Sequence, residues 1–206
     1  DALPIYNPNL TIPSDIPFVT IDRFFSSSVP CIASDNFSGG VIAARKLKEL
    51  GCTNVAFLRI GSRITNEPSK RKDGFVSACV ELGLPFEVLA LEDGQPYARF
   101  EEFLRQHIRD GKLAFDGLFA GTDFLAWQVI RTLRSMRIRV PEDVQVIGFD
   151  GIRMFGDQEP VVSTIVQPVQ EIAETCVSTV LSHHMANVPS LICLPVSYLC
   201  GGTTRE

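Results

Sequence analysis

The sequence has few of the residues on which most catalytic and metal sites depend. Its 206 residues include three histidines and one tryptophan, and its six cysteines form no C-x-x-C pair. Without a His or Cys cluster at ligand spacing, no metal site is predicted. Cysteines spread singly through apolar segments are typical of buried free thiols in a reducing compartment. The cysteine pattern therefore favours a cytoplasmic protein.

Signature motifs of nucleotide binding and serine hydrolysis are also missing. No G-x-G-x-x-G follows a predicted strand, and neither G-x-x-x-x-G-K-[ST] nor G-x-S-x-G occurs. The histidines fall in helical segments without an obvious serine, cysteine or metal partner. The sequence thus indicates neither an enzyme nor a cofactor.

The chain also lacks a positive charge excess and a long apolar run. Its formal net charge is -5, so the clustered Lys and Arg that drive nucleic-acid binding are missing. The densest basic stretch, Arg131 to Arg139, also fits the solvated face of a helix. No apolar run approaches the roughly 18 residues that cross a membrane, and no basic-then-apolar leader opens the chain. This chain alone is not expected to bind DNA or a membrane.

What the chain does have is a regular alternation of short apolar runs and helical apolar stripes. The predicted strands are 18–21, 31–34, 55–58, 86–91, 117–120, 144–149, 163–168 and 192–199. The predicted helices are 39–50, 71–82, 98–109, 124–137 and 169–186. Because strand-helix-strand crossovers are right-handed, this rhythm predicts a parallel sheet covered on both faces, and hence an α/β fold.

One stretch, Val140 to Gly151, combines a helix stop, a buried strand and an acid. Pro141 cannot continue the preceding helix, and residues 144–149 are apolar on both faces. Gly148 lets the backbone come close to another group. Asp150 then emerges at the carboxyl end of the strand, the edge where open α/β sheets bind ligands. The alternative is an Asx turn.

Other polar side chains stand at strand ends and helix starts. Asp22 and Asp35 each follow a short strand, although Asp35 also fits an N-cap. Arg71 lies in the first turn of a helix, where a cation opposes the dipole. Its planar fork suits a sugar diol or carboxylate, and a solvated Lys-Arg-Lys run is an equal alternative. Asp123 fits a helix cap better than a ligand contact, whereas Thr122 remains a candidate contact.

Five segments occur in the order and spacing of one family. They are Asp35-Asn36-Phe37-Ser38-Gly39-Gly40, Leu50-Gly51-Cys52 with strand 55–58, Arg71-Lys72-Asp73-Gly74-Phe75, residues 140–150, and Ser163-Thr164-Ile165-Val166-Gln167-Pro168. Together they resemble the effector domain of lactose/galactose-repressor-type transcriptional regulators, from about Pro17 to Thr204. The resemblance implies a periplasmic-binding-protein-like fold of two α/β lobes, joined by three crossing strands, with a small effector in the cleft.

The resemblance also implies how the chain is divided. Residues 1–50 and 165–188 would form an incomplete N-terminal lobe, and residues 51–164 and 189–206 the C-terminal lobe. Members of the family usually dimerise through this domain and bind DNA through an N-terminal helix-turn-helix, which this chain lacks. A homodimer is therefore expected, with DNA bound only through a headpiece outside this chain.

The family's ligand contacts match this sequence unevenly. Asp22, Arg71 and Asp150 fall on them directly. Thr122 stands where many members have Asn, which allows a different ligand. An aromatic that stacks on the sugar is expected near residues 93–96 but is not present, and Tyr97 is the nearest candidate. The implied effector is a sugar or related polyol, with a purine as the weaker option.

Two other functions remain open. A periplasmic sugar-binding protein of a transport system shares the implied fold, and a signal peptide upstream would favour it. An α/β enzyme is the second, and turnover of a bound sugar would favour that.

Overall fold

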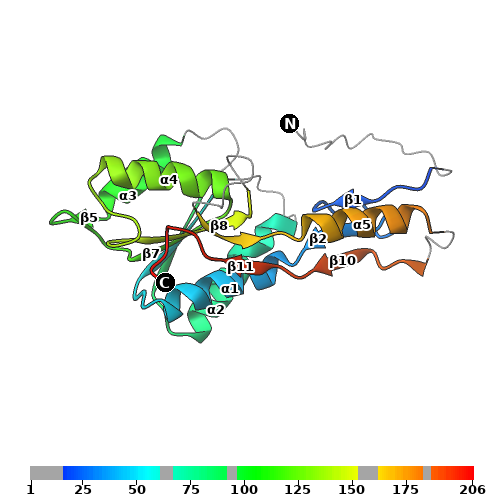
Figure 1. Ribbon diagram of the computed structural model, residues 1–206, viewed down its shortest axis with the longest axis horizontal. Coiled ribbons are helices and arrows are strands. Elements are labelled where there is room, and N and C mark those ends of the chain that lie inside the picture. The colour runs from blue at the N-terminus through cyan, green and yellow to red at the C-terminus, as the bar shows by residue number, and fades with distance from the viewer. Residues whose placement is uncertain (1–15, 61–66, 92–96, 153–161, 183–186) are drawn as a thin grey trace.

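The computed structural model describes residues 16–60, 67–91, 97–152, 162–182 and 187–206. In this part of the chain, two sheets lie toward opposite ends of the long axis of the molecule (Figure 1). The larger has the strand order β11-β9-β8-β7-β3-β4, and the smaller has the order β1-β2-β10. The predicted α/β class is confirmed.

The larger sheet is parallel apart from β11, which runs antiparallel to β9 at one edge. Its central strands β7 and β8 are buried almost throughout, as runs that are apolar on both faces predict. The strands are β3 (Val55–Ile60), β4 (Phe86–Leu91), β7 (Gly117–Ala120), β8 (Gln145–Asp150), β9 (Ser163–Val166) and β11 (Ser197–Leu199).

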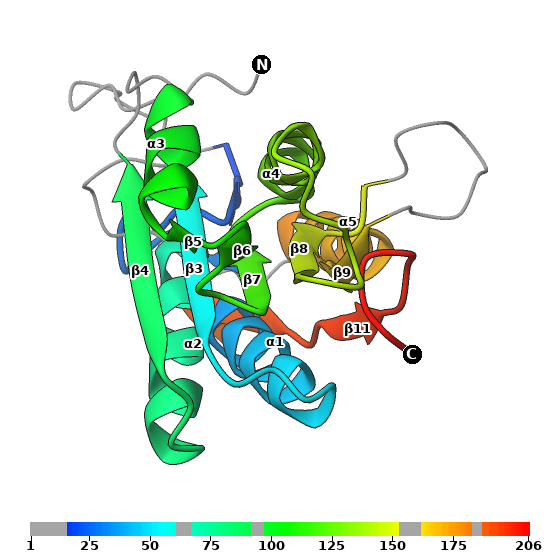
Figure 2. The same ribbon diagram turned by 90° about the vertical axis from the view of Figure 1, so that its left-hand side faces the viewer.

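Helices cover both faces of this sheet (Figure 2). On one face lie α1 (Asn36–Glu49) and α2 (Lys70–Glu81), the latter preceded by a 3-10 turn, η1 (Glu67–Ser69). On the other lie α3 (Ala98–Gln106) and α4 (Asp123–Ser135).

The third predicted helix ends earlier than expected. Instead of continuing to Arg109, the chain forms a hairpin of β5 (Ile108–Arg109) and β6 (Lys112–Leu113). Asp110 and Gly111 both have positive φ, 51° and 74°. Two such residues in succession form the turn that a tight hairpin favours, and they stop a helix.

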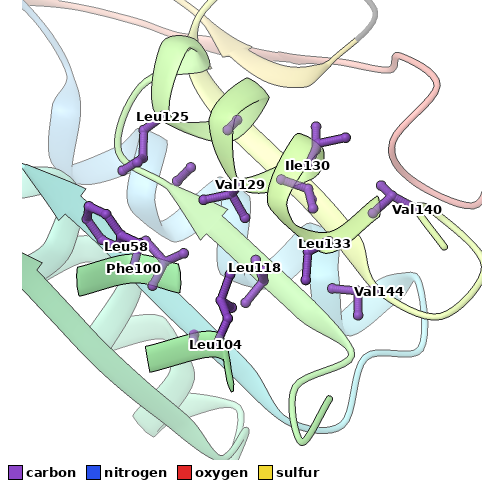
Figure 3. Close-up of a cluster of buried hydrophobic side chains, with 14 of the residues drawn as sticks. Leu58, Phe100, Leu104, Leu118, Leu125, Val129, Ile130, Leu133, Val140 and Val144 are labelled. Atoms are coloured by element: carbon purple, nitrogen blue, oxygen red, sulfur yellow. The ribbon is translucent and has the colours of Figure 1, made fainter. Parts of the chain in front are cut away.

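Each face of the larger sheet has its own apolar core. Figure 3 shows the first, in which Leu118 from the sheet meets Phe100 of α3 and Leu133 of α4. In the second, three phenylalanine rings meet with centroids 5.1 to 5.8 Å apart. They come from β3, α2 and β7 and are Phe57, Phe75 and Phe119.

The smaller sheet is parallel and consists of β1 (Thr20–Ile21), β2 (Cys31–Ser34) and β10 (Leu191–Leu194). Helix α5 (Val169–Val180) lies against β2. Only two of its residues, Ile172 and Thr179, are buried.

The chain passes between the two sheets three times (Figure 1). It does so between β2 and α1, between β9 and α5, and between β10 and β11. The sequence predicted a single last strand over 192–199, which was wrong. Pro195 separates β10 from β11, and since proline lacks the N–H of a ladder, the two halves pair in different sheets.

Two elements lie on the other side of the expected lobe boundaries, which is a correction. Helix α1, within 1–50, packs against α2 and the larger sheet, because its apolar stripe is buried with Phe57 and Phe75. Strand β10, within 189–206, pairs with β2 of the smaller sheet. The stripe consists of Ala43, Ala44 and Leu47.

All six cysteines are free. Cys31, Cys52 and Cys79 are buried, as predicted, whereas Cys193 and Cys200 are exposed. The described residues contain no group of His, Cys, Asp and Glu that could hold a metal ion. None of the helices in these ranges has the length and apolar character needed to span a membrane.

Candidate ligand-binding site

Arg71, in the first turn of α2, is the buried centre of the site, with 5% of its surface exposed. Its Nε donates to Asn36 Oδ1 at 2.7 Å, and its Nη1 donates to the Gly121 carbonyl at 2.6 Å and to Asp150 Oδ1 at 3.3 Å. The guanidinium carbon lies 3.6 Å from the centre of the Phe149 ring, which adds a cation–π contact. The alternative of a solvated basic run is therefore wrong for this residue.

Burial lowers the pKa of Arg71, and the neighbouring Asp150 and Asp22 oppose this effect. Arginine stays protonated in proteins, so Arg71 is a fixed positive charge with several directed donors.

Two glycines explain why Arg71 lies beside the start of α1. A Cβ at Gly40 would overlap the carbonyl oxygen of Arg71, and a Cβ at Gly74 would overlap that of Phe37. Because glycine has no Cβ, α1 and α2 can approach closely, and this brings Asn36 within hydrogen-bond distance of the guanidinium.

Asp150 ends β8, as predicted, and its carboxylate faces Arg71. Oδ1 also accepts a hydrogen bond from Gln167 Nε2 at 2.8 Å, while Oδ2 accepts none from the described residues. Burial raises the pKa of Asp150, and Arg71 and Gln167 oppose the rise. The backbone has φ values of 126° at Asp150 and 77° at Gly151. Such values are unfavourable for a residue with a side chain, so tertiary contacts must hold this turn.

A closed ring of hydrogen bonds links this pair to both sheets. Ser34 Oγ, at the end of β2, donates to Gln167 Oε1 at 2.8 Å, and Asn36 Nδ2 donates to the Ser34 carbonyl at 2.9 Å. The ring thus runs from Ser34 through Gln167, Asp150, Arg71 and Asn36 back to Ser34. Its geometry depends on the placement of the smaller sheet relative to the larger one.

Sequence reasoning did not select Ser34, Asn36 or Gln167 as site residues. All three belong to predicted strands or quoted segments, so the residues themselves were in view. The sequence did not show that two crossings of the chain between the sheets bring these three residues together.

Asp22 follows β1 and brings a carboxylate from the smaller sheet. It interacts electrostatically with Arg71, and burial raises its pKa against that attraction. Its Oδ1 is buried and accepts no hydrogen bond from the described residues. Buried carboxylate oxygens are seldom left unpaired, and a ligand hydroxyl donating to Oδ1 would remove the cost.

Two predicted contacts cap helices. Asp35 caps α1, since its carboxylate accepts from the backbone N–H and the hydroxyl of Ser38 at 2.9 and 2.7 Å. Thr122 caps α4, since its Oγ1 accepts from the N–H of Leu125 at 3.2 Å. The capping interpretation of Asp35 is confirmed, and for both residues the side chain already has a structural partner.

Tyr97 does not lie beside Arg71. Its hydroxyl pairs with Thr132 Oγ1 at 3.0 Å, well along α4, and its ring lies against Phe100 with centroids 5.7 Å apart. The stretch Asp93 to Pro96, where the aromatic was expected, lies outside the described residues.

Asp123 is not a cap, contrary to the prediction. It is 3% exposed, its Oδ1 accepts from the Thr164 hydroxyl, and its Oδ2 accepts from the Ile152 N–H at 2.7 Å. A Cβ at Gly148 would overlap its Oδ1, which identifies the group that Gly148 approaches. Burial raises the pKa of Asp123 to about 6. The Asp123 carboxylate therefore stabilises the turn that follows Asp150.

A cavity of about 300 Å³ opens beside Arg71, at the carboxyl ends of β3 and β7. Its volume is at the lower end of the range for small-molecule sites. The residues that line it are Phe57, Arg59, Ile60, Pro68, Arg71, Gly121, Thr122, Phe124, Leu125 and Gln128.

The two sheets with their helices form two α/β lobes, and a buried polar site lies where the lobes meet. This arrangement is that of a two-lobed binding protein. Residues 44–204 match the family of periplasmic binding protein-like domains, and the chain belongs to that family. The resemblance predicted from the sequence is confirmed.

Several of the curated relatives that match are operon repressors. The sucrose operon repressor of Pediococcus pentosaceus is 28% identical over 198 residues, which covers 91% of this chain and 58% of the relative. The ribose operon repressor of Halalkalibacterium halodurans is 30% identical over 162 residues, which covers 77% and 46%. The chain thus spans about half the length of these relatives.

Solved structures show the same fold. A LacI family transcriptional regulator from Enterococcus faecium with bound ribose has a TM-score of 0.75 and 26% identity, covering 91% of this chain and 70% of that one. A periplasmic binding protein/LacI transcriptional regulator from Alkaliphilus metalliredigens, complexed with D-xylulofuranose, has a TM-score of 0.77 and 23% identity, covering 93% and 72%.

Proposed function

We propose that this chain is the effector-sensing domain of a DNA-binding transcriptional regulator and binds a small sugar or related polyol where its two sheets meet. The observation that carries this proposal is the constellation of Arg71, Asp150 and Asp22. A buried guanidinium with directed donors, next to carboxylate oxygens that accept no hydrogen bond from the described residues, matches the alternating donors and acceptors of vicinal hydroxyls. A purine is the weaker candidate.

Binding would influence the placement of the sheets because its contacts come from both. Asp22 follows a strand of the smaller sheet, whereas Asp150 ends a strand of the larger sheet and Arg71 lies in a helix that covers it. A ligand that contacts both sides favours the placement in which all contacts form. Coupling of this kind is typically about 1 to 3 kcal/mol.

The regulator would act as a homodimer in the cytoplasm, with DNA contacted by a segment outside this chain. Helix α5 supports the dimer, because two of its apolar residues and the apolar residue at its C-cap are largely exposed. They are Val169, Val177 and Leu181, at 66%, 60% and 72%. An exposed apolar stripe of this kind is typical of an interaction surface.

A transport binding protein shares this fold and is the alternative. The regulator is favoured because the curated relatives described above are repressors and because the six cysteines are free. Those relatives also give no support to an enzyme.

A thermal-shift screen of sugars, polyols and purines tests the proposal. A ligand at about one hundred times its Kd stabilises the folded state by about 2.7 kcal/mol, which raises the melting midpoint. We expect a sugar or polyol to give this shift, and Asp22→Asn to weaken it. Asp35→Asn is the matched control, because asparagine still caps α1. The absence of a shift with every compound would contradict the proposal.

A further inference from the structure

The groups around Arg71 differ in charge. The carboxylates of Asp150 and Asp22 interact with its guanidinium. Arg71 also lines the 300 Å³ cavity, and none of the described residues that line this cavity is acidic. The lining instead includes a second guanidinium, that of Arg59. The site therefore has an acidic part and a basic part.

Arg71 has an unused donor for the basic part. Its Nε and Nη1 are engaged by Asn36, Gly121 and Asp150, whereas Nη2 forms no hydrogen bond with any described residue. The residue is 5% exposed and lines the cavity. Nη2 can therefore donate to an acceptor of a ligand that enters the cavity.

Arg59 supplies a charge that no described residue balances. It lies near the carboxyl end of β3 and is half-buried, and its side chain forms no hydrogen bond or ion pair within the described ranges. The charge of Arg71, by contrast, has Asp150 at 3.3 Å. One positive charge at the cavity thus remains without a counter-charge among the described residues.

The walls of the cavity increase the effect of that charge. Phe57, Leu125 and Pro68 are apolar, and the partly exposed Ile60 and Phe124 extend the apolar lining. Because electrostatic attraction is stronger beside apolar, weakly polarisable walls than in water, an anion here would be held more firmly than on an open surface.

We infer that this cavity takes an anionic group of the effector, a phosphate or a carboxylate, bound between Arg59 and Nη2 of Arg71. Guanidinium groups bind both anions through paired hydrogen bonds. This inference rests on the proposed function, because the polyol part of the same ligand would bind Asp150 and Asp22. The effector would then be an acidic sugar derivative, either a sugar phosphate or a sugar acid.

Calorimetry on the intact chain with matched ligand pairs tests this assignment. The probes are ribose and ribose 5-phosphate, glucose and glucose 6-phosphate, glucose and gluconate, and inorganic phosphate alone. In at least one pair, the anionic member should bind about 10 to 100 times more tightly than the neutral one, the usual range for a hydrogen bond to a charged group. If only the sugar phosphates bind more tightly than their neutral partners, the anion is a phosphate. If only gluconate does so, the anion is a carboxylate.

Two variants test whether Arg59 causes the tighter binding of the anionic ligand. Arg59→Gln should abolish the preference for the anionic member, so that both members of a pair bind with similar affinity. Arg45→Gln removes the same charge from an exposed site on α1 and should keep the preference. Circular dichroism verifies that both variants are folded. A preference that survives in Arg59→Gln would overturn the inference.

The two proposals fail in different ways. If a neutral sugar binds and its anionic partner binds no better, the basic cavity is not an anion site, while the proposed function stands. If no sugar, sugar acid or sugar phosphate binds, the proposed function fails and this inference fails with it.

Discussion

The two sheets differ in how completely they are covered. The larger sheet has an apolar core on each face, whereas the smaller one has α5, most of whose residues are not buried (Figures 2 and 3). A region with few buried contacts can change its placement at low free-energy cost. The larger sheet and its helices therefore hold Arg71 and Asp150 rigidly. The position of Asp22 relative to them depends on the segments that connect the two sheets.

The largest effect is expected in the core of the larger sheet. Phe119 is fully buried between the rings of Phe57 and Phe75. Phe119→Ala should lower the free energy of unfolding by about 3 to 5 kcal/mol, because it removes apolar contacts and leaves a cavity. Urea denaturation followed by the fluorescence of Trp127 measures this. A loss below about 1 kcal/mol, the size of an ordinary surface effect, would mean that this core is not the stable region.

Removal of the Arg71 guanidinium should mainly weaken the binding of the effector. Arg71→Ala should cost roughly 2 to 5 kcal/mol of effector affinity, because it leaves buried acceptors without a donor. Calorimetry with the sugar found in the thermal-shift screen measures the loss. Arg45→Ala, on an exposed face of α1, is the control. Unchanged affinity in Arg71→Ala would remove this residue from the site.

Asp123 should make stability depend on pH. Its pKa rises from 3.8 to about 6 on folding, so the folded state binds the proton more tightly. The resulting stabilisation is fully present below about pH 4 and is lost as the pH rises through about 6; its size is at most about 3 kcal/mol.

Asp123→Asn should therefore flatten the stability profile between pH 4 and 7, as measured by urea denaturation at each pH. Asparagine can still accept from the Ile152 N–H and can donate to the Thr164 hydroxyl, so the turn is kept. Asp110→Asn, at the exposed hairpin, should leave the profile unchanged. A variant profile with the same slope as the wild type would mean that another group titrates.

The ring of hydrogen bonds should couple the sheets weakly. Ser34→Ala removes the hydroxyl that donates to Gln167 and should cost about 1 kcal/mol of stability. A double-mutant cycle with Gln167→Ala isolates the coupling. Ser178→Ala, on the exposed side of α5, provides the comparison. Additive effects of Ser34→Ala and Gln167→Ala would show that the ring does not link the two regions.

The smallest effect on stability is expected on α5. Val177 is 60% exposed, so Val177→Ser should change the free energy of unfolding of the monomer by no more than about 0.5 kcal/mol. If α5 forms the dimer, sedimentation velocity should show more monomer in this variant. An unchanged dimer population would place the interface elsewhere.

Much of the fold could be predicted from the sequence because its signals are local. The strand bounds 86–91 and 117–120 match the structure, and α1 and α2 follow the predicted apolar stripes. The division of 192–199 between two sheets was missed, because pairing partners are not encoded in the strand itself. The same limit applied to Asp123, whose partners Thr164 and Ile152 are distant in the chain.

By itself, the sequence determined the α/β rhythm, the acid at the end of β8 and the arginine at the start of α2. These follow from residue type and spacing along one element. Only the tertiary structure decided that Arg71 is buried, that Asn36 and Gln167 orient it with Asp150, and that a basic cavity opens beside it. The reason is physical: hydrogen bonds and burial join residues tens of positions apart, and their partners are fixed when the chain crosses between the sheets.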